Sequence, residues 1–85
     1  MKKATFEIKF EEGLHARPAM EFCQVAMKYY SNIQVIKNGE AFEAKSMLSV
    51  LCMGASKGDV IEVVAEGQDE EEAMKAITKL LESEA

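Results

Sequence analysis

The segment ATFEIKFEEGLHARPAMEFCQVAMKYY, residues 4–30, indicates the fold because its hydrophobic period changes once within it. From Ala4 to Phe10 apolar and polar residues alternate, which is typical of a strand with one buried face. From Ala19 to Tyr30 the apolar residues recur at helical spacing, and one face carries Ala19, Phe22, Cys23, Ala26, Tyr29 and Tyr30. We therefore expect a half-buried strand that leads into an amphipathic helix.

Further strands are expected downstream of this helix. Residues 33–37 and 40–44 are short β-prone runs on either side of Asn38-Gly39, the dipeptide best suited to the positive φ angles of a type I′ hairpin turn. These two strands should pair antiparallel. The run 60–65 predicts the last strand.

Two further helices are indicated by residues typical of helix ends. Ser46 precedes the apolar run 47–53 and Gly54 follows it, which predicts an N-capped helix of about two turns with a glycine stop. Asp69 and Glu72 form a candidate capping box for the last helix. The apolar stripe of that helix consists of Ala73, Ile77, Leu80 and Leu81.

The predicted order βαββαβα favours an α+β fold. Each helix has an apolar stripe that can lie on one face of a sheet, so a two-layer sandwich is the expected packing. A chain of 85 residues supplies apolar material for a single core, and it contains no linker or repeat. We expect one domain over residues 1–85.

Composition and charge exclude several classes of protein. With 48% hydrophobic and 29% charged residues, the chain has the composition of a folded protein. The net charge is -5, with acidic residues gathered at 69–72 and in the C-terminal tail, which disfavours nucleic acid as a partner. No stretch approaches the roughly 20 apolar residues of a membrane span, and the N-terminus lacks a signal-peptide core. We expect a cytoplasmic protein with no membrane partner.

The two cysteines do not indicate a redox or metal site. Cys23 and Cys52 lie far apart in the sequence without CxxC spacing, and both fall within apolar patterns, so each is expected to be a small core residue. A zinc site is further disfavoured because the chain has one histidine.

That histidine lies in the segment Gly13-Leu14-His15-Ala16-Arg17-Pro18-Ala19, which also holds the only arginine and the only proline. Proline is tolerated in the first turn of a helix because its missing N–H would be unpaired there. It also biases the preceding residue away from helical dihedral angles. The helix should therefore begin at about Arg17 or Pro18, just after His15.

This position suits an anion bound to the histidine. Unpaired backbone N–H groups and the positive end of the helix dipole favour negative charge, so a phosphoryl group on His15 would find donors in place. The same potential favours a neutral, nucleophilic ring, and Arg17 offers a fork of donors to phosphoryl oxygens. Gly13 permits a close approach of the loop to that group. The alternative interpretation is a surface histidine in a turn, followed by a proline that only starts the helix.

Residues 13–19 resemble the active-site signature of the HPr phosphocarriers, small proteins of the phosphoenolpyruvate-dependent sugar phosphotransferase system. The similarity extends over the whole chain in length and element order. It implies an open-faced sandwich, with an antiparallel sheet ordered 1-4-2-3 and three helices on one face. It also implies that enzyme I phosphorylates His15 on Nδ1, that Arg17 holds the phosphate, and that a sugar-specific IIA component receives it. Such a protein is a stoichiometric carrier rather than an enzyme and needs no cofactor.

A second resemblance lies at Lys45-Ser46-Met47-Leu48, which is similar to the segment with the regulatory serine in HPr proteins of Gram-positive type. It implies that an ATP-dependent HPr kinase/phosphorylase modifies Ser46, and that a catabolite-control transcription regulator is a further partner. The alternative is a routine N-cap without regulation. A phosphate at this N-cap would change the surface charge without unfolding the helix.

Some residues depart from the family pattern and leave other functions open. Glu12 stands where relatives usually carry a small hydroxyl or amide residue, and its carboxylate would oppose a phosphoryl anion if it pointed inward. Met20 and Met27 replace smaller or more polar residues. One alternative is therefore an HPr-like regulatory paralogue, for catabolite repression or a nitrogen-linked phosphorelay, although the catabolite-repression homologue lacks the histidine. A less favoured alternative is an acylphosphatase-like enzyme.

An apolar docking patch is expected beside His15. Met20, Gln24 and Met27 share a helix face turned roughly 90° or more from the core stripe. On the short helix, Met47, Leu48 and Leu51 cannot all point inward together with Val50, so some must face solvent. Flexible methionine suits a surface that accepts several partners in turn. The alternative is that Met20 and Met27 pack against the short helix and extend the core.

Overall fold

Seven elements follow one another in the order that the sequence predicts. The computed structural model describes residues 1–82, and the end of the predicted domain, with part of its acidic tail, lies outside the described residues. The elements are β1 (Lys2–Glu7), α1 (Ala16–Met27), β2 (Asn32–Lys37), β3 (Glu40–Glu43), α2 (Met47–Met53), β4 (Val60–Glu66) and α3 (Glu70–Glu82).

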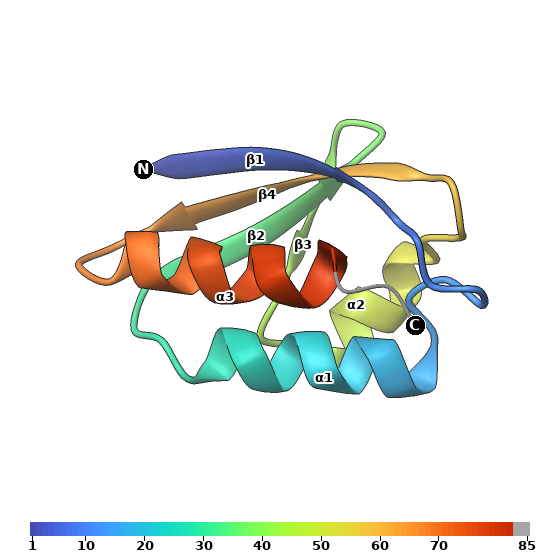
Figure 1. Cartoon of the computed structure of the whole chain (residues 1–85), viewed down its shortest axis with the longest axis horizontal. Helices are drawn as coiled ribbons and strands as arrows, with labels where there is room; N and C mark the ends of the chain where they lie inside the picture. Colours follow the sequence, from blue (N-terminus) through green and yellow to red (C-terminus); the bar gives the residue numbers. More distant parts are fainter. Residues whose placement is uncertain (83–85) are drawn as a thin grey trace.

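The strands form one antiparallel sheet in the order β1-β4-β2-β3 (Figure 1). In the β2–β3 hairpin, Lys37 pairs with Glu40, and the residues between them have positive φ angles, 52° at Asn38 and 82° at Gly39. The expected turn chemistry and the strand order implied by the family resemblance are therefore both confirmed.

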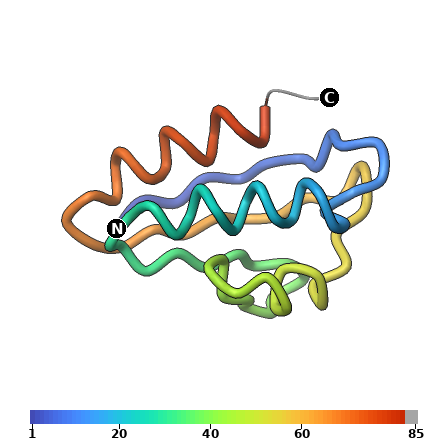
Figure 2. The backbone as a smooth tube through the Cα atoms, turned by 90° about the horizontal axis from the view of Figure 1, so that it is seen from below, coloured from blue at the N-terminus to red at the C-terminus, as the bar shows by residue number. Residues whose placement is uncertain are grey.

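Three helices cover one face of this sheet (Figures 1 and 2). Figure 2 shows α1 between the other two, with α2 on one side and α3 on the other. The strands turn alternate apolar residues toward the helices, which gives the two-layer sandwich expected from the sequence. The largest fully buried side chains include Phe22, Ile33, Val35, Ile61, Val63, Ile77 and Leu81.

The first strand ends earlier than its hydrophobic alternation predicts. Ile8 and Phe10 are buried as expected, but β1 ends at Glu7, which is opposite Val60, the first residue of β4. Next to this pair, the residues that precede β4 form a loop rather than a strand, and Ile8 N donates a hydrogen bond to Asp59 O in this loop at 2.8 Å. The alternation therefore marks burial correctly, whereas the strand ends where its partner ends.

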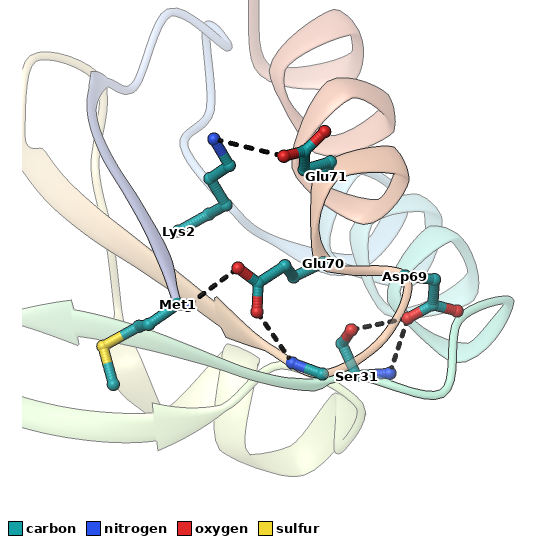
Figure 3. Close-up of polar contacts among 7 residues, drawn as sticks. Met1, Lys2, Ser31, Asp69, Glu70 and Glu71 are labelled. Carbon is teal, nitrogen blue, oxygen red and sulfur yellow. Dashed lines mark hydrogen bonds and ion pairs between the residues drawn. The ribbon is translucent and has the colours of Figure 1, made fainter.

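The first helix also ends earlier than expected, at Met27. The Asp69 carboxylate holds the following turn, because it accepts a hydrogen bond from Tyr30 N. It also accepts hydrogen bonds from the backbone N–H and the hydroxyl of Ser31 (Figure 3). Tyr30 is consequently 94% exposed, so its predicted place on the core face is wrong. The same hydrogen bonds, above all that from the Ser31 hydroxyl, lower the pKa of Asp69.

The predicted capping box of α3 does not form, because Asp69 is engaged by the turn after α1. Glu70 instead accepts a hydrogen bond from Gly67 N at 3.0 Å, which closes the turn before the helix. Its other oxygen lies 2.7 Å from the amino group of Met1, and this contact is the main cause of the lowered pKa of Glu70 (Figure 3). The start of α3 is thus joined to β1 and to the end of α1.

The cysteines differ from each other in burial. Cys23 is buried, as expected, and Cys52 is exposed on α2, where the prediction of a core position is wrong. A helix of seven residues has room for few inward positions, and Val50 and Met53 occupy them. Across residues 1–82, none of the helices has the length and apolar character needed to span a membrane.

Candidate functional site

His15 is the N-cap residue of α1. Its φ of -89° and ψ of -159° are extended, and its carbonyl accepts the first helical hydrogen bond, from Ala19 N at 2.8 Å. The helix therefore begins at Ala16, slightly before the start at about Arg17 or Pro18 that the sequence predicts. Pro18 fits within the first turn because the N–H that it lacks would have no intrahelical acceptor there. The His15 side chain is exposed and makes no capping hydrogen bond.

The start of α1 offers backbone donors to an anion. Within the described part of the chain, the N–H groups of Ala16 and Arg17 have no hydrogen-bond acceptor, and Pro18 has no N–H to satisfy. Arg17 is exposed and forms no ion pair with any carboxylate of residues 1–82. Glu12 is likewise exposed and outside these ion pairs. The positive end of the helix dipole and the guanidinium are therefore both open to a negatively charged group beside His15.

Two adjacent loops hold this helix start in place. We call residues 8–15 the His15 loop and residues 54–59 the support loop. Three backbone hydrogen bonds of 2.8 to 2.9 Å join them: Ile8 N to Asp59 O, Gly58 N to Ile8 O, and Leu14 N to Ala55 O. The support loop was not predicted as part of the site, although the small residues Gly54, Ala55 and Ser56 at its start are a signal for closely packed backbone.

Gly13 is required where the two loops touch. Its φ is 71°, and a Cβ atom there would lie 2.3 Å from the carbonyl oxygen of Ala55 and 2.9 Å from Cα of Ser56. The close approach at Gly13 is made to the backbone of the support loop, whereas the sequence predicted an approach of the loop to the phosphoryl group on His15. The next residue, Leu14, is 2% exposed and anchors the loop in the core directly before His15.

Ser46 is the N-cap of α2, as predicted. Its Oγ accepts a hydrogen bond from Ser49 N at 3.2 Å, and its carbonyl accepts one from Val50 N at 3.0 Å. Gly54 ends the helix in the left-handed region with a φ of 64°. The support loop therefore begins at the end of α2 opposite to Ser46.

The residues predicted to form a docking patch lie on two adjacent helices, and all but Met47 are exposed. On α1, Met20 is 44% and Met27 63% exposed, and Gln24 is exposed. On α2, Leu48 is 72% and Leu51 38% exposed, whereas Met47 is half-buried against the core. The alternative in which Met20 and Met27 extend the core is therefore wrong. We call these six residues the α1–α2 patch.

A thiol links the two helices that carry this patch. Cys23 Sγ, on α1, donates to the carbonyl of Lys45 at 3.1 Å and lies 3.8 Å from Sδ of Met27. The Lys45 ammonium in turn donates to the carbonyl of Tyr29 at 2.7 Å. These contacts fix the residue before Ser46 against α1.

The site is an exposed helix start rather than a cleft. One surface cavity, of about 390 Å³, lies between β1 and α3, and another, of about 290 Å³, lies over the face of the sheet that carries no helix. Neither cavity is lined by His15, Arg17 or Ser46. Among the residues described, no cluster of three or more His, Cys, Asp or Glu side chains is arranged to hold a metal. An exposed histidine of this kind suits a reaction with the surface of another protein.

Comparison with known proteins identifies the class. A family model described as the HPr component phosphorylation site of the phosphotransferase system matches residues 2–83. The phosphocarrier protein HPr of Neisseria meningitidis is 41% identical over 81 residues, which are 95% of this chain and 91% of the relative. The HPr-like protein Crh of Halalkalibacterium halodurans is 37% identical over 84 residues, covering 99% of this chain and 100% of the relative.

Solved structures agree with this class. A crystal structure of HPr from Thermoanaerobacter tengcongensis is 49% identical with a TM-score of 0.95, covering 98% of this chain and 93% of that chain. A crystal structure of HPr from Bacillus anthracis is 30% identical with a TM-score of 0.90, covering 95% of this chain and 96% of that chain. The chain belongs to the HPr family of phosphocarrier proteins of the phosphotransferase system.

The contact between Gly13 and Ala55 can be tested against a second glycine with positive φ. Gly39→Ala, where nothing lies within 4 Å of the new Cβ, is expected to cost about 1 to 2 kcal/mol of stability from the backbone conformation alone. Gly13→Ala should cost about 1 to 3 kcal/mol more, because the methyl group overlaps the support loop. Urea denaturation of both variants measures the difference, and equal losses would contradict the requirement for close approach.

Proposed function

We propose that this chain is a cytoplasmic phosphocarrier that accepts a phosphoryl group on His15 from enzyme I and passes it to a sugar-specific IIA component. The observation that carries the proposal is the exposed His15 ring at the N-cap of α1, beside two N–H groups that have no acceptor within residues 1–82. Membership of the HPr family supports the same reaction.

The transfer needs a neutral ring with an available lone pair. In the proposed reaction, the lone pair of Nδ1 forms the new P–N bond while the bond between phosphorus and the donor atom of enzyme I breaks, and the donor atom keeps that electron pair. The N–H groups of Ala16 and Arg17, together with the Arg17 guanidinium, then stabilise the phosphoryl oxygens. Because the helix start is exposed, the same group can be presented to a second protein.

Partner proteins are proposed to bind the α1–α2 patch. Its methionine and leucine side chains form an exposed apolar surface on α1 and α2, and α1 is the helix that His15 caps. Apolar side chains with flexible thioethers adapt to different protein surfaces without a specific hydrogen-bond pattern. One surface can therefore serve both enzyme I and the IIA component in successive encounters.

Phosphorylation of Ser46 by HPr kinase/phosphorylase is proposed as regulation, and a catabolite-control transcription regulator as a further partner. Ser46 lies next to Met47 and Leu48 of the α1–α2 patch, so a phosphate there would place negative charge at the edge of the docking surface. The N-cap position tolerates the modification, since the first-turn N–H groups of α2 favour an anion.

Other functions are separated by one measurement. An HPr-like regulatory paralogue is favoured by the similarity to the Crh protein of Halalkalibacterium halodurans. An acylphosphatase-like enzyme would turn over and release inorganic phosphate. Incubation with phosphoenolpyruvate and enzyme I, followed by intact mass and acid lability, distinguishes a phosphohistidine carrier from a paralogue that is phosphorylated only on serine and from an acylphosphatase-like enzyme.

The acceptor role predicts the behaviour of His15 and Arg17 variants. Wild type should gain one acid-labile phosphoryl group, and His15→Ala should gain none. Arg17→Ala should fold normally and accept the group roughly 10- to 100-fold more slowly, because a charged hydrogen bond to the phosphoryl oxygens is lost. Lys28→Ala removes an exposed cation at the other end of α1 and serves as the control. Full phosphorylation of His15→Ala would refute the proposal.

The regulatory role predicts a charge effect at Ser46. HPr kinase with ATP should modify Ser46, and Ser46→Asp should accept phosphoryl groups from enzyme I several-fold more slowly, since negative charge repels an acidic partner surface. Ser46→Ala loses the cap, with a stability cost of about 1 kcal/mol, but adds no charge and should transfer normally. The prediction fails if ATP-dependent phosphate maps to another residue, or if Ser46→Asp is phosphorylated at the wild-type rate.

The docking role predicts separate effects on stability and binding. A double substitution of Met20 and Leu48 by Ser should leave the melting temperature nearly unchanged, because both side chains are exposed, and should weaken binding to enzyme I about ten-fold or more. Tyr30→Ser removes an exposed aromatic residue outside the patch and should bind normally. Unchanged binding by the double variant, measured by calorimetry, would contradict the assignment of the patch.

A further inference from the structure

The support loop is held in shape by one carboxylate. Oδ2 of Asp59 accepts a hydrogen bond from Ser56 N at 2.8 Å, and Asp59 N donates to Ser56 O at 2.9 Å. The two residues therefore close a turn across Lys57 and Gly58, and the φ of Gly58 is 94°. Removal of the carboxylate leaves Ser56 N without its acceptor and lets the adjoining Ala55 peptide rotate.

A lysine from the sheet reaches the same carboxylate. Nζ of Lys37, the last residue of β2, lies 3.7 Å from Oδ2 of Asp59 and donates to the carbonyl of Met53 at 3.4 Å. Met53 is the last residue of α2, where a cation is favoured by the helix dipole. The Lys37 side chain is only 20% exposed, so its charge is less screened by solvent than that of a surface lysine. One ammonium thus joins the sheet, the end of α2 and the support loop.

The contacts continue from this pair to the phosphoryl acceptor. Ala55 lies directly before Ser56 and accepts the hydrogen bond from Leu14 N, and His15 follows Leu14. We propose that Lys37 and Asp59 are positioning residues for phosphoryl transfer at His15, because they fix the support loop against which the His15 loop is packed. This inference rests on the proposed function and concerns the geometry of the acceptor.

Position matters here because the ring and the helix N–H donors must meet one phosphoryl group. A displacement of the order of 1 Å can cost up to about 100-fold in rate when it misaligns reacting atoms. Lys37 and Asp59 lie behind the site rather than on the α1–α2 patch. Loss of either side chain should therefore lower the rate of phosphoryl transfer at a saturating partner concentration, and should leave unchanged the partner concentration that gives half of that rate.

The chain offers a matched control for the charge pair. Nζ of Lys57 lies 3.1 Å from Oε1 of Glu11, and this pair also joins the support loop to the His15 loop. Both side chains are well exposed, at 54% and 82%, and such surface pairs contribute little to stability. Lys57→Met removes one positive charge, as Lys37→Met does, without affecting the turn at Asp59.

The experiment compares Asp59→Ala, Asp59→Asn, Lys37→Met and Lys57→Met with wild type. Single-turnover transfer from phosphorylated enzyme I gives the saturating rate and the half-saturation concentration, and NMR gives the chemical shifts of the His15 ring. We expect Asp59→Ala and Lys37→Met to lower the saturating rate about ten-fold and to move the ring shifts, with half-saturation unchanged. Asp59→Asn keeps an acceptor for Ser56 N and should recover part of the rate, and Lys57→Met should match wild type.

Each outcome supports or overturns the inference. A wild-type rate in Asp59→Ala, or a change confined to half-saturation, overturns it. An equal loss in Lys57→Met also overturns it, because the effect would then be one of net charge. If Asp59→Ala does not fold, the transfer rates and ring shifts of Asp59→Asn and Lys37→Met test the inference instead. If wild type accepts no phosphoryl group, the proposed function fails, and the His15 ring shifts still test whether Lys37 and Asp59 position the ring.

Discussion

The contact between the backbones of Gly13 and Ala55 is the constraint on which the functional end of the molecule depends. It brings a loop from the N-terminal strand against a loop that follows α2, and it leaves no room for a side chain at Gly13. Leu14 fills the core beneath it, and His15 can then cap α1 with its ring in solvent. The proposed phosphoryl acceptor is thereby held on the surface by groups that are themselves buried.

The arrangement of the helices separates the proposed phosphoryl acceptor from the proposed docking surface. α1 lies between α2 and α3 (Figure 2), and the residues just before it are joined to the support loop by the hydrogen bond from Leu14 N to Ala55 O. The acceptor and the α1–α2 patch therefore share a helix but use different parts of it. The proposed chemistry at the helix start would depend on hydrogen bonds and charge, whereas the proposed docking would depend on exposed apolar side chains.

Local signals predicted most of this fold, and tertiary contacts account for the errors. The turn at Asn38-Gly39 and the caps of α2 follow from residues next to one another, and both were predicted. The ends of β1 and α1 depend on partners about 40 to 50 residues away, such as Asp69 at the turn after α1. The motif around His15 and Arg17 pointed to the candidate site, whereas residues 54–59 match no known site motif, and the contact of this loop with the site is seen only where Gly13 meets Ala55.

The strand order also determines when the sheet can be completed during synthesis. β1 is made first, yet its neighbour is β4, and Lys2 is opposite Ala65. A nascent chain can form the β2–β3 hairpin early, but β1 leaves the ribosome long before its partner exists. Such distant pairing has a large loop-closure entropy and is slow compared with hairpin formation. The pairing of β4 with both β1 and β2 must therefore wait until residues 60–66 have been synthesised.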